Sequence, residues 1–222
     1  ISTSASAAVG AVFALMSLIQ ALGGGFGMGA GSIISRKLGE KKDDEASMYG
    51  SCAFFGALAF GAFIMLFGLI FLTPLMRLLG STETILPYSE SYARIILLAA
   101  PVMCASFVLN NTLRSEGEAM LSMYGICAGG LLNVALDPLF IFGLDMGVTG
   151  AAFATILSQF VSFVLLFIGV QRSDSLKIHF RNYKPNAHYL KNIINGGTPS
   201  LCRQGLNSVS TIVLNTVAKG YG

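Results

Sequence analysis

One acidic residue lies deep inside an apolar stretch of the chain, with an amide on the same helix face. Asp137 is the only charged residue between Glu118 and Asp145. A carboxylate at the depth of a bilayer costs a few kcal/mol or more, which makes such a residue a functional candidate by default. Asn133 lies four residues earlier, so the two side chains share one face of a helix. The pair predicts a pocket of polar oxygen atoms within lipid.

A proline follows the acid directly. Pro138 has no backbone N–H to donate, and its ring clashes with the carbonyl of Val134, so we expect a kink at this point of the helix. The freed carbonyl of Val134 then adds a further oxygen near Asp137.

The composition indicates which class of protein has to hold this pocket. Of 222 residues, 54% are hydrophobic and only 11% are charged, with a mean hydropathy of +0.69. A soluble protein carries about 25% charged residues. We therefore expect an all-α, polytopic membrane protein.

Cysteine and histidine do not indicate a metal centre or a disulfide. The four cysteines are far apart and each lies in an apolar run: Cys52, Cys104, Cys127 and Cys202. We interpret them as small core residues. His179 and His188 fall in a polar connection, where solvated side chains are the simpler interpretation. We expect no cofactor.

Six apolar segments are separated by short polar connections. They cover residues 7–35, 46–75, 95–113, 119–143 and 149–171, and a last segment that begins near Gly196 or Pro199. The second half of the first segment is rich in glycine pairs spaced by four, such as Gly23/Gly27 and Gly25/Gly29, which allow another helix to approach closely.

Lysine and arginine in the connections predict how the segments are oriented. Connections 36–45, 114–118 and 172–191 together hold ten such residues, whereas connections 77–94 and 144–148 hold two. By the positive-inside rule, the three connections with ten such residues lie on the cytoplasmic side of the cell membrane. The first segment then runs from outside to inside, so we expect a helix before it and regard the chain as a fragment.

The same orientation predicts how deep two polar side chains, Asp137 and Thr155, lie in the bilayer. Asp137 precedes Asp145 by eight residues, and Thr155 follows Gly147 by eight, each roughly 12 Å along a helix. The tight connection 144–148 makes the two segments neighbours. We therefore expect Asp137 and Thr155 at a similar depth in the outer half of the bilayer.

Two segments carry polar stripes at helical spacing. The first consists of Thr155, Ser158, Gln159 and Ser162, and the second of Ser200, Arg203, Gln204, Asn207, Ser208, Thr211 and Asn215. Such stripes either join helices by hydrogen bonds or line a hydrated substrate cavity. We favour the cavity, with Ser158, Gln159, Ser162, Gln204, Asn207 and Thr211 as candidate substrate contacts. Arg203, near the inner end, could also snorkel.

Four strings carry a resemblance to a known family: GMGAGSIISRKLGEKK, FLTPLMRLLGSTETILPYSESYARIILLAAP, NNTLRSEGEAMLSM and LLNVALDPLFIFGLDMGVTGAAFATILSQ. They resemble multidrug and toxic compound extrusion (MATE) transporters, closest to the prokaryotic branch similar to DNA-damage-inducible proteins. That family has twelve helices in two six-helix lobes. The resemblance implies that residues 1–171 are helices two to six of the N-lobe, 172–195 a cytoplasmic linker, and 196–222 the truncated first helix of the C-lobe.

The resemblance also implies a site for the coupling cation, H⁺ or Na⁺. Similar transporters use an Asp on helix one, an Asn and an Asp four residues apart on helix five, and a Thr on helix six. Asn133 and Asp137 match the spaced pair, and Thr155 matches the Thr by position. The helix-one Asp would lie in the part of the family that this sequence does not cover.

These observations together predict a cation-coupled antiporter that exports amphipathic small molecules, cationic ones in particular. Its partners would be drug-like substrates, the bilayer and the remainder of the same transporter, with no role for nucleic acid. A flippase for lipid-linked saccharides is the alternative within the superfamily; it would need a strongly cationic cavity, for which only Arg203 is a candidate. A non-transporting scaffold is disfavoured by Asp137. An enzyme would need a nucleophile–base pair, and the segments offer one Asp and no His, so we do not expect one.

Overall fold

The computed structural model describes residues 3–173, 176, 178 and 187–218, and these are almost entirely helical, with no strand among them. In chain order the elements are α1 (Thr3–Gly39), α2 (Asp43–Ile70), α3 (Leu72–Leu78), α4 (Leu86–Ser115), α5 (Ala119–Pro138), the π-helix η1 (Leu139–Gly143), α6 (Gly147–Arg172) and α7 (Ala187–Ala218). Within the described residues, five helices are long and apolar enough to cross a membrane: α1, α2, α4, α5 with η1, and α6. The all-α, polytopic prediction is confirmed.

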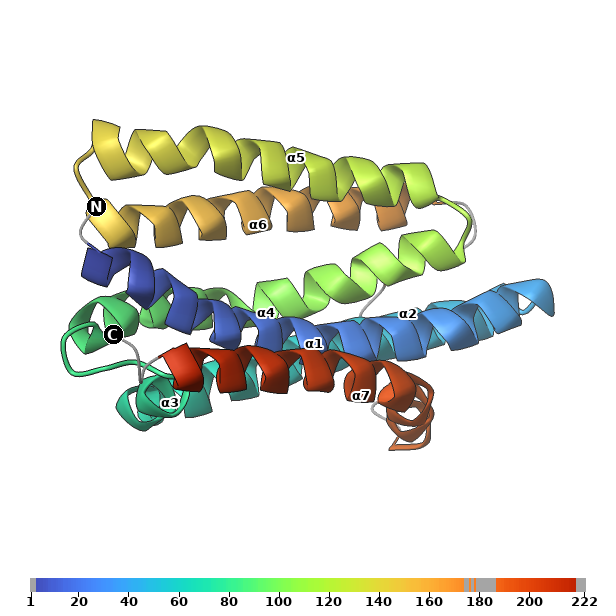
Figure 1. The fold of residues 1–222 in the computed structure, drawn as a ribbon. Helices are drawn as coiled ribbons and strands as arrows, with labels where there is room; N and C mark the ends of the chain where they lie inside the picture. The colour runs from blue at the N-terminus through green and yellow to red at the C-terminus, as the bar shows by residue number, and fades with distance from the viewer. Residues whose placement is uncertain (1–2, 174–175, 177, 179–186, 219–222) are drawn as a thin grey trace.

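Helix α1 lies at the centre of the molecule, between α4 on one side and α7 on the other (Figure 1). Its glycines explain this position. A Cβ at Gly27 would lie 2.7 Å from the carbonyl oxygen of Phe107 in α4, and a Cβ at Gly29 would overlap the carbonyl of Ile193 in α7. Residues two apart point to roughly opposite sides of a helix, so the two glycine spacings allow two close neighbours.

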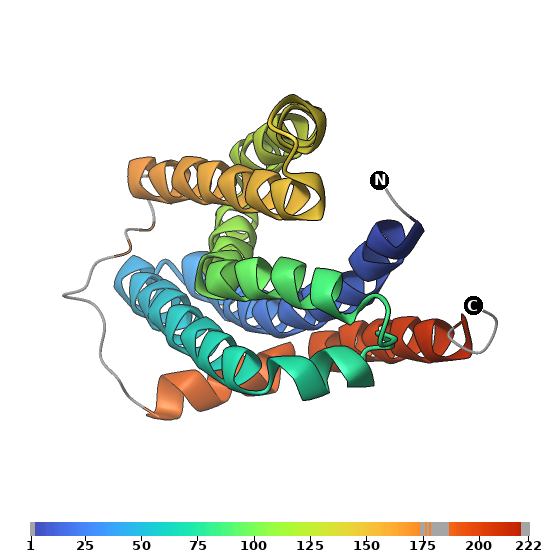
Figure 2. The same ribbon diagram turned by 90° about the vertical axis from the view of Figure 1, so that its left-hand side faces the viewer.

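Helices α5 and α6 form an antiparallel pair that is joined to the rest through α4. Figure 2 shows this pair on one side of α4, with α1, α2 and α7 on the other side. The main apolar core lies where α1, α2 and α4 meet, and it includes the fully buried side chains of Ile19, Ile96, Leu97 and Leu109.

Three boundaries differ from those expected from the sequence. Helix α4 begins at Leu86 rather than near residue 95, because Pro87 lies in its first turn, where a missing N–H costs nothing. Helix α2 ends at Ile70, and the short helix α3 replaces its expected last turn.

The third difference is the start of α7 at Ala187, well before Gly196. Packing explains the early start. Ile193 is fully buried, and the ring of Tyr189 lies edge-on to Tyr49 of α2, with 4.8 Å between centroids. These contacts outweigh the low helix propensity of Gly196 and the following glycine. Residues 187–195 of the predicted linker are thus helical, as is Arg172 at the end of α6, while 174–175, 177 and 179–186, including His179, lie outside the described residues.

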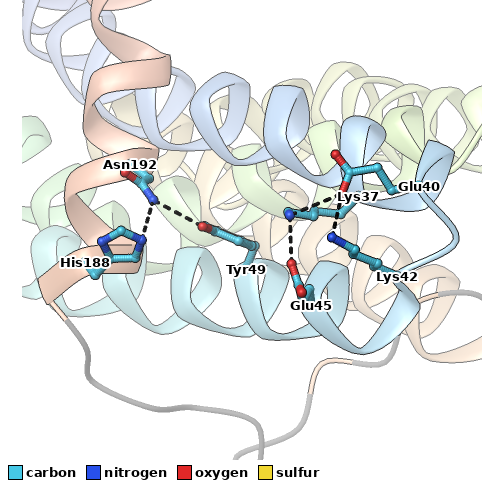
Figure 3. A network of polar contacts seen from close by, with 7 residues as sticks. All are labelled: Lys37, Glu40, Lys42, Glu45, Tyr49, His188 and Asn192. Carbon is cyan, nitrogen blue, oxygen red and sulfur yellow. Dashed lines mark hydrogen bonds and ion pairs between the residues drawn. The ribbon is translucent and has the colours of Figure 1, made fainter.

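The three connections predicted to be cytoplasmic start from one end of the bundle. The Ser115 hydroxyl at the end of α4 donates to the carbonyl of Gly31, 3.0 Å away, near the end of α1. Figure 3 shows the polar contacts at the same end: Lys37 bonds Glu45 at 2.7 Å, and Asn192 of α7 donates to the Tyr49 hydroxyl at 3.2 Å. The shared end agrees with the predicted alternation of the segments.

Candidate functional site

The backbone changes its helical type immediately after Asp137. Pro138 ends α5, and the next five residues form the π-helix η1, in which Leu144 N–H bonds the carbonyl of Leu139 at 3.0 Å. A proline that cannot continue the i→i−4 ladder accounts for the change. A change of helical type therefore follows Pro138 directly, and the expected kink there stays a prediction. Short π-helical turns frequently occur at functional sites.

The turn after η1 brings α6 back against α5. Asp145 and Gly147 both have positive φ, 52° and 57°, which lets the chain reverse within a few residues. A Cβ at Gly150 would lie 2.7 Å from the carbonyl oxygen of Phe140, so α6 approaches η1 closely. The prediction that the two segments are neighbours is confirmed.

A cavity of about 340 Å³ lies where α1, α4, α5 and α6 meet. Its lining contains all three residues predicted to form the ion site, together with two of the predicted substrate contacts. The lining residues are Val9, Phe13, Met16, Tyr92, Gly129, Gly130, Asn133, Asp137, Ala151, Thr155, Ser158 and Gln159.

Polar side chains face this cavity from three helices, α4, α5 and α6. On α5, the Asn133 amide donates to a carboxylate oxygen of Asp137 over 3.3 Å, which leaves the Asn133 Oδ1 available as an acceptor. Tyr92 of α4 lies near Thr155 of α6 across the cavity. The Thr155 hydroxyl donates to the carbonyl of Ala151 at 2.9 Å.

The oxygen atoms at this cavity determine what it can bind. One carboxylate, the amide oxygens of Asn133 and Gln159 and the hydroxyl oxygens suit a proton or a hard cation, whereas transition metals prefer imidazole or thiolate ligands. Asp137 is the only lining residue that carries a full negative charge at neutral pH. One monovalent cation would therefore neutralise the site.

The remaining predicted substrate contacts divide between two places. Ser158 and Gln159 line the cavity, and Ser162 is buried one turn further along α6, packed against Gly129 of α5. The α7 residues do not line it. Gln204 and Thr211 are half-buried and Asn207 is exposed, on a helix that packs against α1 and α2. The side chains of Ser208 and Asn215 lie outside those that the structure describes.

Sequence reasoning missed Tyr92 and the apolar wall of the cavity. Tyr92 had been assigned to a connection because the start of α4 was placed too late; Pro87, as a helix-start signal, could have corrected this. The wall formed by Val9, Phe13 and Met16 has no sequence signal, because nearly all of the first segment is apolar.

The sequence matches a family model described as MatE over residues 1–139. It is also similar to curated proteins named "Multidrug export protein MepA". The protein from Staphylococcus aureus (strain MRSA252) is 33% identical over 217 residues, which cover 97% of this chain and 48% of that protein. The protein from Staphylococcus saprophyticus is 31% identical over 218 residues, with the same coverage. The chain thus spans about half the length of the curated relatives it matches.

Solved structures of transporters that their titles assign to the MOP superfamily have the same fold. One, titled as the inward-facing conformation of a multidrug resistance MATE family transporter, matches with a TM-score of 0.91 and 33% identity over 97% of this chain and 49% of that chain. A structure titled as outward-facing matches with a TM-score of 0.89, covering 98% of this chain and 49% of that chain at 33% identity. A transporter from Pyrococcus furiosus, whose title describes a binding pocket of reverse polarity and a different function, matches with a TM-score of 0.88 and 33% identity over 98% of this chain and 48% of that chain.

Proposed function

Because this chain belongs to the MatE family, a family of multi-pass membrane transporters rather than enzymes, we propose that it is part of a cation-coupled antiporter that exports amphipathic small molecules. The observation that carries the proposal is the cavity in which Asp137, Asn133 and Thr155 converge from two helices. The printed name of the staphylococcal relatives, a multidrug export protein, supports the export of drug-like molecules.

The coupling step centres on Asp137. A proton or a sodium ion on this carboxylate removes its charge and alters its hydrogen bond with Asn133. The π-helix begins two residues later, at Leu139, where the backbone already departs from the α-helical ladder. A segment of this kind offers two helical arrangements that the charge state of Asp137 can bias. Cation uptake from outside then drives the release of the exported molecule.

The shape and lining of the cavity suit an amphipathic substrate. Its volume of about 340 Å³ falls within the roughly 300–1,000 Å³ of small-molecule pockets. Phe13 and Met16 provide an apolar wall, and Gln159 provides a polar contact. We extend the substrate path to Ser162 and to the α7 residues Gln204, Asn207 and Thr211, which would face the rest of the transporter.

The charge of the cavity lining favours drug export over the alternative function, a flippase for lipid-linked saccharides. A flippase for lipid-linked saccharides has to hold a phosphate-bearing group, which calls for lysine or arginine. The lining described above contains neither, and its charged side chain is the acid Asp137. This acidic lining favours the export of cations over the transport of anionic lipids.

The test uses the full transporter that contains this chain, reconstituted in liposomes, with drug efflux driven by a pH gradient and separately by a Na⁺ gradient. Asp137→Asn should abolish gradient-driven efflux and keep the fold, because the amide is nearly isosteric. Asn133→Ala and Thr155→Ala should weaken efflux less, since each removes one neutral ligand. Asp145→Asn is the matched control: this acid lies in the exposed α5–α6 connection, and Asn tolerates its positive φ.

Wild-type efflux from Asp137→Asn under both gradients would contradict the proposal. Asp137 would then be a structural hydrogen-bond partner, and coupling would depend on residues elsewhere in the transporter.

A further inference from the structure

The hydroxyl group of Ser158 at the cavity differs in its hydrogen bonding from two other hydroxyl groups of α6. Thr149 donates to the carbonyl of Met146 at 2.6 Å, and Thr155 donates to that of Ala151 at 2.9 Å. Ser158 is only 3% exposed, and within the residues that the structure describes its Oγ has no hydrogen-bond partner. A buried hydroxyl left unpaired costs roughly 1–3 kcal/mol. A side chain held in this state points to a ligand outside the protein.

Ser158 lines the same cavity as Asp137 and lies one helical turn further from the outer connection than Thr155. The closest backbone across the α5–α6 contact is Gly129, where a Cβ would lie 3.1 Å from the carbonyl oxygen of Ser158. Asn133 is one turn from Gly129, on the side toward Asp137. Ser158 is therefore level with the stretch of α5 between Gly129 and Asn133.

The oxygen atoms at this level are all neutral. The Asn133 amide nitrogen is used by Asp137, so its Oδ1 remains free to accept, and the Ser158 Oγ has its lone pairs free. Next to a single carboxylate, neutral oxygens of this kind complete the coordination of a hard cation. A proton on Asp137 needs none of them. Asp137 and Tyr92 are the titratable groups of the lining.

We propose that Ser158 supplies a hydroxyl oxygen to a sodium ion bound at this cavity, together with Asp137 and Asn133, and so determines how strongly the site binds Na⁺ relative to H⁺. The inference rests on the proposed function and adds to it a residue, Ser158, and the preference for Na⁺ over H⁺. At about 340 Å³ the cavity has room for several waters of about 30 Å³ each, so the ion keeps part of its hydration shell.

The experiment measures the thermal unfolding midpoint of the full transporter against Na⁺ concentration, with choline chloride keeping the ionic strength constant. A second series varies pH without Na⁺. Na⁺ should stabilise the wild type. Ser158→Ala should raise the Na⁺ concentration that gives half the effect by roughly tenfold, the size expected for one lost contact. In the pH series, the unfolding midpoints of Ser158→Ala should match those of the wild type.

Ser106→Ala is the matched control, because this serine is also buried in a membrane helix, α4, but does not line the cavity and donates to the carbonyl of Val102 at 2.8 Å. It should leave both series unchanged. The unfolding midpoint of Ser158→Ala in choline chloride alone reveals any loss of stability that is independent of Na⁺.

Three outcomes would contradict the role of Ser158 or the coupling role of Asp137. An unchanged Na⁺ response in Ser158→Ala overturns the inference and leaves the hydroxyl bound to water alone. A wild type that responds to pH and not to Na⁺ also overturns it, while proton coupling through Asp137 stands. If Asp137→Asn keeps both responses of the wild type, the proposed coupling site fails as well.

Discussion

Glu116 carries a carboxyl group in an unusual setting at the end of α4. Within the described part of the chain, both of its carboxyl oxygens are buried and lack a hydrogen-bond partner at bonding distance. Burial is the largest influence and raises its pKa to about 7, while the nearby Ser173 lowers the pKa and Glu118 raises it. The group is therefore held more readily in its protonated form in the folded protein than in the unfolded chain.

This setting predicts how Glu116 affects stability with pH. The folded pKa of about 7 lies above the ordinary value of 4.5, so the folded state loses stability as pH rises between these values. Glu116→Gln removes the charge and should raise the unfolding midpoint at pH 8, with little effect at pH 5. Thermal unfolding of the full transporter at both pH values measures this. Glu83→Gln, at an exposed glutamate paired with Arg77, should show no comparable gain at pH 8.

Equal effects of Glu116→Gln at pH 5 and pH 8 would mean that the carboxylate is solvated in the assembled transporter. The prediction would then be wrong.

Residue spacing alone predicted one half of the site. Asn133 and Asp137 had to share a face because four residues make about one helical turn, and the structure joins them by a hydrogen bond. Tyr92 and Thr155 come from different helices, and their contact depends on how each helix is rotated about its axis. Spacing within one segment carries no information on that rotation.

At the scale of helices, hydropathy located the segments and packing determined where they end. The α5–α6 pair was predicted correctly because a short connection forces antiparallel neighbours. The start of α7 was not, since it depends on the contact of Tyr189 and Asn192 with Tyr49, more than 130 residues earlier in the chain. Glycine pairs indicated close helix contacts, and the structure adds which helix each pair meets.

The glycine contact between α1 and α7 leads to a prediction at this scale. A Cβ at Gly29 would overlap the carbonyl of Ile193 and lie 2.8 Å from the backbone nitrogen of Gly197. Backbone atoms cannot rotate away as side chains do, so Gly29→Ala must push the two helices apart. We expect a loss of about 1–3 kcal/mol, as in overpacked cores, seen as a lower unfolding midpoint of the full transporter.

Gly24→Ala is the matched control for this substitution. Gly24 is on the same helix, and a Cβ there would meet nothing within 4 Å. It should be neutral or slightly stabilising, because alanine favours helix more than glycine does. Equal midpoints for the two variants would show that α1 and α7 are not in close contact in the assembled transporter.

At the scale of the molecule, four helices, α1, α4, α5 and α6, line the cavity that contains Asp137, and one further helix, α7, packs against α1. The polar stripe of α7 is partly exposed, at Asn207 for example. The chain spans about half the length of its relatives, and we propose that this stripe contacts the rest of the transporter or its substrate.

The orientation of the whole bundle in the membrane is the last prediction. The connections after α1 and after α4 lie at one end, as the bond from Ser115 to Gly31 requires, and the α5–α6 connection lies at the other. The ten-to-two bias in lysine and arginine assigns the first end to the cytoplasm. In a cysteine-free background, Lys41→Cys should therefore resist a membrane-impermeant thiol reagent added to whole cells, and Leu144→Cys should react. Both positions are exposed in the fold, so accessibility differs only by the side of the membrane.

Permeabilised cells serve as the control, because both cysteines should then react. Labelling of Lys41→Cys in intact cells would invert the orientation, and the Asp137 cavity would open toward the inside.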